Sequence, residues 1–314
     1  MQRLEWQVIR RLDGLLQGDY RSLFYGYGVD FADLREYQPE DDIRYIDWNV
    51  TARMDMPYVR QYVEDREITA WFLIDLSPSM DFGTTVTDKR AMLIDLVGTL
   101  ARLLTRHGNR IGAVLYDGKL PDKRSAQGSR QRSERVLPAK GGRNHVLHLI
   151  HELLKQPRLP AAGMTDLKVM LEGGLGSIKK RSLIFILSDF ISAPGWERPL
   201  TLLKQRHEVV AVRLWDPREV DLPDVGPVWM QDAETGEQLY VDTHDPKFRA
   251  RFAEVIQQRE AALSAAFRRA GVEEWSLSTG EDLVRAVVRF AAIRKQLHRA
   301  RGAAESALPA QAFR

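Results

Sequence analysis

The sequence predicts an α/β protein with a doubly wound, mainly parallel sheet flanked by helices. Residues 68–76 and 182–188 are nearly continuous apolar runs, which is typical of strands buried on both faces. Apolar runs of this kind alternate along the chain with segments of helical periodicity, and this alternation favours a parallel sheet. The 314 residues are enough to bury a large core.

The first 66 residues have a different character from the rest. Residues 1–18 place Leu4, Val8 and Leu12 near one face, which predicts an amphipathic helix. Residues 19–66 are rich in aromatic and charged side chains, and the Tyr and Trp content argues against disorder. We expect them to form short strands and turns that lie across another surface. Residues 1–66 are therefore predicted to be a separate segment.

The domain predicted for residues 67–301 begins with a strand, a helix and two more strands. After the strand at 68–76, residues 89–107 carry an apolar stripe at helical spacing, with Asp88 as a candidate N-cap and Gly108 as the C′ residue. Residues 110–116 form the next apolar run, and 135–138 predict a short strand.

The second half of this domain continues the alternation. Its predicted elements are, in order, helices at 145–155 and 166–178, a strand at 182–188, a helix at 196–205, a strand at 208–214, a hairpin at 228–241, a helix at 245–270, a strand at 273–278 and a helix at 281–299. The hairpin is predicted to be an insertion near 226–243, and residues 302–314 a flexible tail.

Composition excludes several kinds of function. The chain has no cysteine, which rules out disulfides, thiolate metal sites and a cysteine nucleophile. The net charge is only +3, and the basic runs at 123–135, 179–181 and 294–301 lack interleaved aromatic residues. Solvated surface is the favoured interpretation of these runs, and nucleic-acid binding is not expected.

No membrane segment is predicted either. The longest apolar runs reach about a third of the ~20 residues that span a bilayer. Charges interrupt the first residues, which therefore do not resemble a signal peptide. We expect a cytoplasmic protein without direct membrane insertion.

Polar side chains follow the two most apolar strands. Asp75, Ser77 and Ser79 come after the first run, Asp189 follows the run at 182–188, and Thr165 precedes a predicted helix between them. In a doubly wound sheet, ligands bind outside the carboxyl ends of the strands, at the point where the strand order reverses. We therefore expect these five residues to meet at one edge.

Their chemistry suits a hard divalent cation. Residues at i, i+2 and i+4 of an extended segment point to the same side, and Pro78 favours an extended Ser77. The resulting ligand set of two carboxylates and three hydroxyls fits Mg²⁺, while Mn²⁺ or Ca²⁺ would suit similar oxygens. If one Asp acts through water, the ion keeps a positive charge and an open position that a partner's carboxylate can fill. The three hydroxyls are alternatively turn residues, and Thr165 or Asp166 is a candidate helix cap.

The pattern Asp-x-Ser-x-Ser with a distant Thr and Asp resembles the metal-ion-dependent adhesion site of von Willebrand factor A domains. By that resemblance Asp75, Ser77 and Ser79 are first-loop ligands, Thr165 is the second-loop ligand and Asp189 is the third-loop carboxylate. The matching fold is a doubly wound sheet with the strand at 135–138 as its antiparallel edge.

A second resemblance lies in residues 30–53, which read DFADLREYQPEDDIRYIDWNVTAR and are followed by Val59-Arg60. This stretch is similar to the bacterial family called domain of unknown function 58, whose members are often associated with MoxR-type AAA+ ATPases. The resemblance implies a non-enzymatic adaptor with a chaperone-like or complex-assembly role, and with no catalytic residue.

Two other functions remain as alternatives. One is a Mg²⁺-dependent phosphatase-like hydrolase with Asp75 as nucleophile. Such sites need a second Asp two residues on as general acid, and Ser77 stands there. The other is nucleic-acid binding through the basic runs, which would show a steep salt dependence.

Overall fold

The computed structural model describes residues 33–38, 43, 46–54, 56–61, 68–85, 87–118, 134–158 and 163–306. Its chain divides into two compact units: the larger holds Thr69–Phe290, and the smaller holds described residues up to Ile68 and from Ala291 onward. The helix predicted for residues 1–18 lies outside the described residues, as do the last eight residues of the predicted tail, 307–314.

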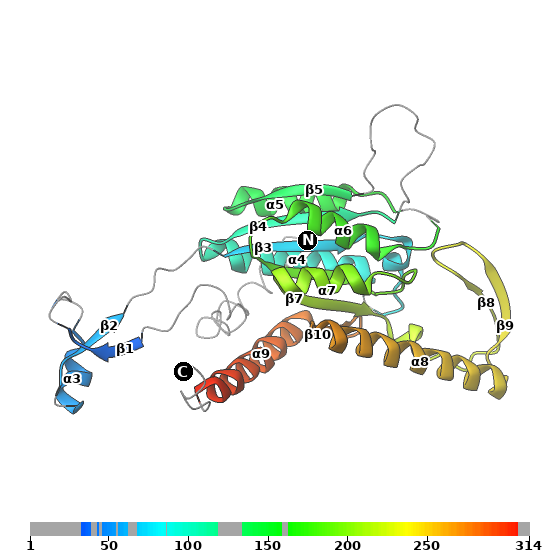
Figure 1. The fold of residues 1–314 in the computed structure, drawn as a ribbon. Coiled ribbons are helices and arrows are strands. Elements are labelled where there is room, and N and C mark those ends of the chain that lie inside the picture. Colours follow the sequence, from blue (N-terminus) through cyan, green and yellow to red (C-terminus); the bar gives the residue numbers. More distant parts are fainter. Residues whose placement is uncertain are drawn as a thin grey trace. The chain divides into compact units, whose positions relative to one another are not determined.

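The larger unit is built on a six-stranded sheet whose order confirms the predicted fold class (Figure 1). The order is β10-β7-β6-β3-β4-β5, and every neighbouring pair is parallel except β4 with β5. The strands are β3 (Thr69–Asp75), β4 (Arg110–Tyr116), β5 (Glu134–Lys140), β6 (Leu183–Ser188), β7 (Glu208–Trp215) and β10 (Glu273–Ser278). In chain order this is the 3-2-1-4-5-6 arrangement of doubly wound folds, which reverses between β3 and β6.

Helices cover both faces of the sheet (Figure 1). The helices of this layer system are α4 (Lys89–Arg106), α5 (Arg143–Lys155), α6 (Leu167–Ser177), α7 (Glu197–Arg206) and α8 (Pro246–Ala270). Trp71 and Leu73 point to the core shared with α6, α7 and α8. Phe72 points to the opposite face and stacks on Phe185 with ring centroids 5.6 Å apart. Because side chains alternate along β3, both faces of this strand are buried, as its apolar run predicted.

The two ends of α4 follow the predicted signals. Asp88 caps α4 by accepting a 2.6 Å hydrogen bond from the Ala91 amide, and Gly108 follows the helix with φ of 81°. Gly271 ends α8 in the left-handed conformation with φ of 66°. The last helix, α9 (Leu283–Ser306), continues past the predicted end near residue 299. Ala303 and Ala304 lie in this extension, and alanine is the best helix former.

The smaller unit contains the predicted short strands and one helix that was not predicted. β1 (Asp33–Glu36) pairs antiparallel with β2 (Tyr58–Gln61). Between them lies the short helix α3 (Trp48–Met54), whose Val50 amide donates to Asp47 Oδ1 at 3.3 Å. Its seven residues span too few turns to show a clear apolar period, which explains why the pattern did not reveal it.

The predicted hairpin consists of β8 (Pro227–Gln231) and β9 (Gln238–Asp242), which pair with each other. It arches away near the start of α8, and its tip returns toward the sheet (Figure 1). At its base, Thr243 Oγ1 donates to the Gly226 carbonyl at 2.8 Å. Trp229 and Tyr240 are 69% and 57% exposed, and their ring centroids lie 5.1 Å apart. The hairpin therefore buries little of its own apolar surface.

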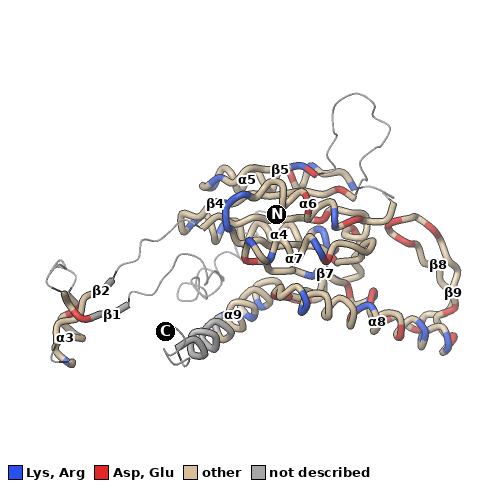
Figure 2. The backbone as a smooth tube through the Cα atoms, viewed as in Figure 1, with Lys and Arg blue, Asp and Glu red and all other residues tan. Residues whose placement is uncertain are grey.

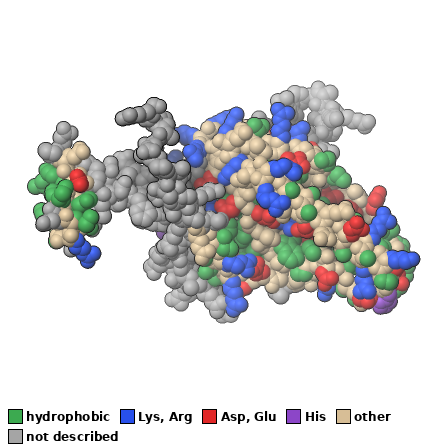
Figure 3. All heavy atoms as spheres, turned by 60° about the horizontal axis from the view of Figure 1, so that its bottom comes forward, with side chains coloured by type: hydrophobic (Ala, Val, Ile, Leu, Met, Phe, Trp, Pro, Cys, Tyr) green, Lys and Arg blue, Asp and Glu red, His purple; other side chains and the backbone are tan. Residues whose placement is uncertain are grey.

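Charges of both signs are interspersed over the larger unit. Lys and Arg predominate along α8, with Glu254 and Glu260 among them (Figure 2), and on the face shown in Figure 3 the two signs are mixed. Lys179, Lys180 and Arg181 are exposed, which agrees with the solvated interpretation of that basic run. Among the described residues, no helix combines the length and apolar character needed to cross a membrane.

Candidate metal site

The loop after β3 buries all three of its predicted ligands. Asp75, Ser77 and Ser79 are 0%, 0% and 5% exposed. The Ser77 amide donates to Asp75 Oδ1 at 3.0 Å, and the hydroxyl oxygens of Ser77 and Ser79 lie 3.1 Å apart. The three polar side chains thus lie together at the carboxyl end of β3.

The backbone of this loop differs from the extended segment that the sequence predicted. Ser77 is extended, with φ of −59° and ψ of 163°, but Pro78–Asp81 forms a 3-10 helix, η2. Pro78 occupies the start of this helix, where its fixed φ and missing amide proton are well tolerated. Ser77 is the N-cap of η2, so its hydroxyl meets that of Ser79 across a turn and not along a strand.

A buried arginine fixes the position of the same loop. Arg90 is 3% exposed, and its Nη2 donates to the Leu76 carbonyl at 2.7 Å. Its Nη1 donates to the carbonyl of Pro157 at 3.3 Å, beyond the end of α5. The Leu76 amide in turn donates to the Tyr116 carbonyl at 2.8 Å. The first loop is therefore held from both β4 and the segment after α5.

In the second loop, Asp166 and not Thr165 is the residue that caps the following helix. Asp166 caps α6, because its Oδ1 accepts from the Lys168 amide at 3.0 Å. Thr165 is 0% exposed, and its hydroxyl donates to Glu234 Oε2 at 2.6 Å. The Thr165 hydroxyl is thus directed away from the helix and to another carboxylate.

The third loop follows β6, whose last residue contacts the last residue of β3. Asp189 is 4% exposed, and its Oδ1 accepts from the Ile191 amide at 3.0 Å. The preceding residue, Ser188, donates its hydroxyl to Asp75 Oδ2 at 2.7 Å. This hydrogen bond joins β3 and β6 at the point where the strand order reverses, which is where the sequence predicted the site.

Phe190, next to Asp189, has an uncommon backbone conformation. Its φ is 57°, in the left-handed region that bulky residues rarely adopt. The ring packs against Trp196 and Phe267 with centroid distances of 5.7 Å and 4.9 Å. The Phe190 amide also donates to Ser188 Oγ at 2.9 Å. Aromatic packing and hydrogen bonding together hold the strained residue in place beside the site.

A buried lysine was not anticipated. Lys89, the first residue of α4, is 0% exposed and donates to Asp189 Oδ2 at 2.7 Å and to Glu219 in the 3-10 helix η3 (Pro217–Glu219). Burial opposes its charge, but these two carboxylates raise the pKa of Lys89 above its usual value. A cation in the first turn of a helix is unfavourable because it opposes the helix dipole. The position of Lys89 at the start of a predicted helix could therefore have indicated a nearby anion.

The second unanticipated residue comes from the β8–β9 hairpin. Glu234 is 8% exposed, although it lies in the turn of a largely exposed element. Its Oε1 accepts from the Ser79 amide at 3.2 Å, and its Oε2 accepts from the Thr165 hydroxyl at 2.6 Å. Glu234 therefore bridges the first and second loops. Its turn is 155 residues beyond Ser79 in the chain, and no local pattern in the sequence signals this contact.

The two buried carboxylates, Asp75 and Asp189, interact electrostatically. Burial and the negative charge of Asp189 raise the pKa of Asp75 to about 7, against hydrogen bonds from Ser188 and Ser77. Burial also raises the pKa of Tyr116, and the charges of Asp75, Asp166 and Glu234 add to that effect. The rim formed by the three loops thus buries the two carboxylates Asp75 and Asp189, and Lys89 is the ion-pair partner of Asp189.

The donor set fits a hard cation. Neighbouring ligands of an octahedral Mg²⁺ are separated by about 2.9 Å, given metal–oxygen distances near 2.05 Å. The Ser77 and Ser79 hydroxyls, 3.1 Å apart, approach this separation. Within the described part of the chain, no group of three or more His, Cys, Asp or Glu side chains is arranged to hold a metal. A site at this rim therefore depends on hydroxyls as well as carboxylates, and ligation by Asp75, Ser77, Ser79, Thr165 and Asp189 stays a prediction.

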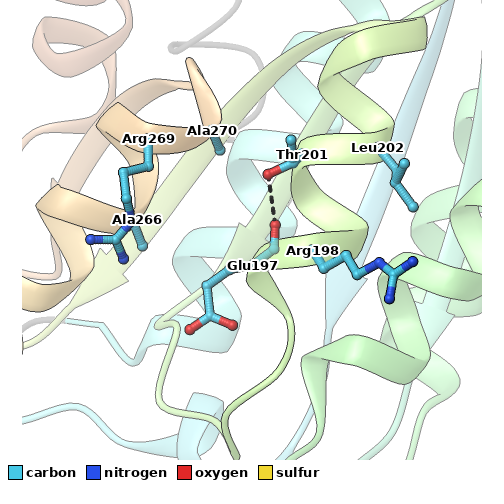
Figure 4. A pocket seen from close by; sticks show the side chains of 7 residues that line it. All are labelled: Glu197, Arg198, Thr201, Leu202, Ala266, Arg269 and Ala270. Atoms are coloured by element: carbon cyan, nitrogen blue, oxygen red, sulfur yellow. Dashed lines mark hydrogen bonds between the residues drawn. The ribbon is translucent and has the colours of Figure 1, made fainter.

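A hollow of about 300 Å³ lies between α7 and α8 (Figure 4). The Thr201 hydroxyl donates to the Glu197 carbonyl at 2.9 Å beside it. Its lining residues are Glu197, Arg198, Thr201, Leu202, Ala266, Arg269 and Ala270. None of them belongs to the rim, and their mostly apolar contact surface offers no cluster of metal ligands.

Comparison with solved structures finds distant matches. BatB from Bacteroides thetaiotaomicron matches with a TM-score of 0.45 and 11% identity, covering 73% of this chain and 99% of that chain. A von Willebrand factor type A protein from Catenulispora acidiphila matches with a TM-score of 0.35 and 11% identity, covering 76% of this chain and 43% of that chain.

Sequence comparison gives much stronger similarities. An uncharacterized protein of Mycobacterium tuberculosis is 36% identical over 296 residues, which cover 94% of this chain and 89% of that protein. One from Mycobacterium avium is 34% identical over 160 residues, covering 51% and 94%. Residues 33–262 match the family described as "Protein of unknown function DUF58". The chain, as its residues 30–53 predicted, belongs to the DUF58 family.

Proposed function

We propose that this protein is a non-enzymatic, cytoplasmic adaptor whose Mg²⁺-dependent rim binds a protein partner. The proposed partner is a MoxR-type AAA+ ATPase, as the family resemblance implies, in a chaperone-like or complex-assembly role. One observation carries the proposal: oxygen-bearing side chains from three loops converge, buried, where the strand order reverses between β3 and β6.

The chain's own groups set the chemistry of this rim. Asp75 and Asp189 would supply charge to Mg²⁺, and the hydroxyls of Ser77, Ser79 and Thr165 would complete the oxygen set. When bound, the ion would supply a Lewis-acidic position for a partner's carboxylate. Ser188 donates a hydrogen bond to Asp75, and Arg90 donates one to the Leu76 carbonyl, so both residues fix the position of the first loop. A cation would also relieve the repulsion between the two buried carboxylates that raises the pKa of Asp75.

The surroundings of Asp75 support binding over phosphoryl transfer. Its side chain is fully buried, and its two oxygens accept hydrogen bonds from the Ser77 amide and the Ser188 hydroxyl. A nucleophile needs access to its substrate, and protonation of a leaving group needs an acid where Ser77 stands. Turnover of phosphate esters that requires Mg²⁺ and is abolished by Asp75→Asn would contradict the proposal.

The direct test measures binding of the MoxR-type ATPase from the same organism. Affinity is determined by calorimetry in Mg²⁺, in EDTA, and after Mg²⁺ is restored. We expect EDTA and Asp75→Asn each to weaken binding by at least about 10-fold, because loss of groups around protein metal sites weakens them by ~10–100-fold. Thr165→Ala should weaken binding in the same direction.

The matched control is Asp221→Asn, which removes an exposed carboxylate that is not part of the rim. This variant should bind as the wild type does. Equal affinity in Mg²⁺ and EDTA, with Asp75→Asn unchanged, would show that the rim does not act through a metal.

A further inference from the structure

The β8–β9 hairpin places an acidic side chain in the rim, where the proposed function expects a partner's acidic side chain to bind. We infer that the Ser79 amide and the Thr165 hydroxyl form a carboxylate-binding subsite, that Glu234 is its resident occupant, and that an acidic side chain of a partner binds there by displacing Glu234. The displacement by a partner rests on the proposed function, whereas the subsite itself does not.

The two donors define what this subsite accepts. Ser79 N donates to one oxygen of Glu234 at 3.2 Å, and Thr165 Oγ1 donates to the other at 2.6 Å. Both residues are buried, with exposed fractions of 5% and 0%. Without an acceptor, each donor would be left unsatisfied in a buried position, which is costly. A two-oxygen anion satisfies both donors at once, so an incoming carboxylate can replace the one that leaves.

The turn that presents Glu234 is organised by its own hydrogen bonds. Asp232 Oδ1 accepts from the amides of Glu234 and Thr235, each at 2.8 Å. The Gly236 amide donates to the Asp232 carbonyl at 2.9 Å. Glu234 is therefore held at the end of a defined turn, and it can leave and return without the turn reforming.

The rest of the hairpin is weakly anchored. β8 and β9 pair only with each other among the described strands, and two-stranded ribbons are marginally stable by themselves. Trp229, Leu239 and Tyr240 are 69%, 61% and 57% exposed. In addition to the contacts of its side chain, Glu234 accepts a hydrogen bond at its main-chain carbonyl from the Gly163 amide, at 3.1 Å. The contacts of one residue thus account for much of the attachment of the tip, which makes its release accessible.

The test uses acetate as the probe and Ser79 amide exchange, measured by NMR on the full chain, as the readout. Glu234→Ala should accelerate exchange of this amide by about 10-fold, because the bond that protects it is lost. Glu237→Ala removes the same charge from the same exposed turn and should leave exchange unchanged. Glu234→Gln keeps the side-chain volume and one acceptor oxygen, so the Ser79 amide should exchange at an intermediate rate. This variant also serves as a control in case the alanine variant does not fold correctly.

Acetate then reports the subsite. It should restore protection of Ser79 in Glu234→Ala, with chloride at equal ionic strength having no effect. In the wild type its apparent affinity should be at least about 10-fold weaker, because the tethered Glu234 competes at a high effective concentration. Equal exchange in Glu234→Ala and Glu237→Ala, or equal acetate protection of wild type and Glu234→Ala, would overturn the subsite.

The partner arm separates this inference from the proposed function. The acetate experiment is performed in EDTA and needs no metal. Its result therefore tests the subsite even if ATPase binding proves independent of Mg²⁺. With Mg²⁺ present, the ATPase should bind Glu234→Ala about 10-fold tighter than wild type, since the competitor is removed. Unchanged or weaker binding of Glu234→Ala, with the wild-type affinity still sensitive to EDTA, would overturn displacement and leave the proposed function intact.

Discussion

The sheet and the β8–β9 hairpin each bring a buried carboxylate to the same rim, but they hold it in different ways. Asp75 ends a strand that pairs with β4 on one side and β6 on the other, and Leu73 and Ile74 before it are fully buried. Glu234 ends a ribbon whose large side chains face solvent, and it reaches the rim through its own hydrogen bonds.

Because of this difference, the carboxylate of Asp75 is fixed by the sheet, whereas that of Glu234 can be replaced by another anion. Moving Asp75 requires disruption of the central strands, where most of the apolar burial lies. Moving Glu234 requires the loss of a few polar contacts that an incoming anion can remake. A binding site gains from this pairing, because one part stays fixed while the other opens.

The largest expected effect tests the rigid side. Phe72→Ala removes a fully buried ring that stacks on Phe185, so it should lower the free energy of unfolding by about 4 kcal/mol. Trp229→Ala, on the exposed hairpin, should change it by less than about 0.5 kcal/mol. Urea unfolding followed by circular dichroism measures both, and similar losses for the two variants would remove the contrast between sheet and hairpin.

The next effect concerns the buried ion pair beneath the rim. Lys89→Met leaves Asp189 buried without its cation, which should cost about 3 kcal/mol of stability. The double variant Lys89→Met/Asp189→Asn should recover part of this loss. If the rim takes up Mg²⁺, the ion should raise the melting temperature of Lys89→Met more than that of the wild type. No difference between them would argue that the rim does not attract a cation.

A smaller effect on stability is expected at the buried carboxylate of Asp216, next to η3. Asp216 is fully buried and accepts from the Thr84 amide at 2.8 Å, the Arg218 amide at 2.9 Å and the Thr279 hydroxyl at 2.6 Å. Burial favours the neutral acid, but these hydrogen bonds hold the pKa of Asp216 below its usual value. We expect Asp216→Asn to cost about 2 kcal/mol at pH 7, since charged acceptors are lost.

The pH dependence gives the sign of this effect. A carboxylate whose pKa falls on folding stabilises the protein above its unfolded pKa of about 3.9, and this contribution disappears as pH falls through the lower folded value. The difference in the free energy of unfolding between the wild type and Asp216→Asn should therefore become smaller below about pH 4. Denaturant titrations at several pH values measure the gap, and a constant gap down to pH 2 would contradict the assignment.

The smallest expected effect removes the hairpin itself. Replacing residues 228–241 by two glycines should lower the free energy of unfolding by only about 1 kcal/mol, mainly from the buried donors that lose Glu234. Thermal unfolding measures the change, and retained secondary structure serves as the control. A loss as large as that of Phe72→Ala would mean that the hairpin is part of the core after all.

Much of the fold could be predicted because it depends on local patterns. The solid apolar runs of β3 and β6 identify strands buried on both faces, and Asp88 and Gly108 mark the ends of α4. Strand ends of a parallel sheet meet at one edge, so placing Asp75 and Asp189 together followed from the order of elements.

The rest of the rim depends on contacts between distant parts of the chain. Glu234 looks like any hairpin acid, and its burial follows only from how the turn folds back onto Ser79 and Thr165. The η2 turn was missed because alternation was assumed beyond Pro78, although proline also starts helices. Lys89 offered a weak signal, since a cation at a helix start needs a nearby anion.

One consequence of the left-handed Phe190 concerns how the interior and the rim are linked. Its ring touches Phe267 on α8 and Trp196 before α7, while its neighbour in the chain is the carboxylate Asp189. We expect Phe267→Ala to remove one of the two aromatic contacts that hold Phe190 in this conformation, and so to change the position of the neighbouring Asp189 carboxylate. The position of the Asp189 carboxylate can therefore depend on substitutions on α8 that change none of the polar residues of the rim.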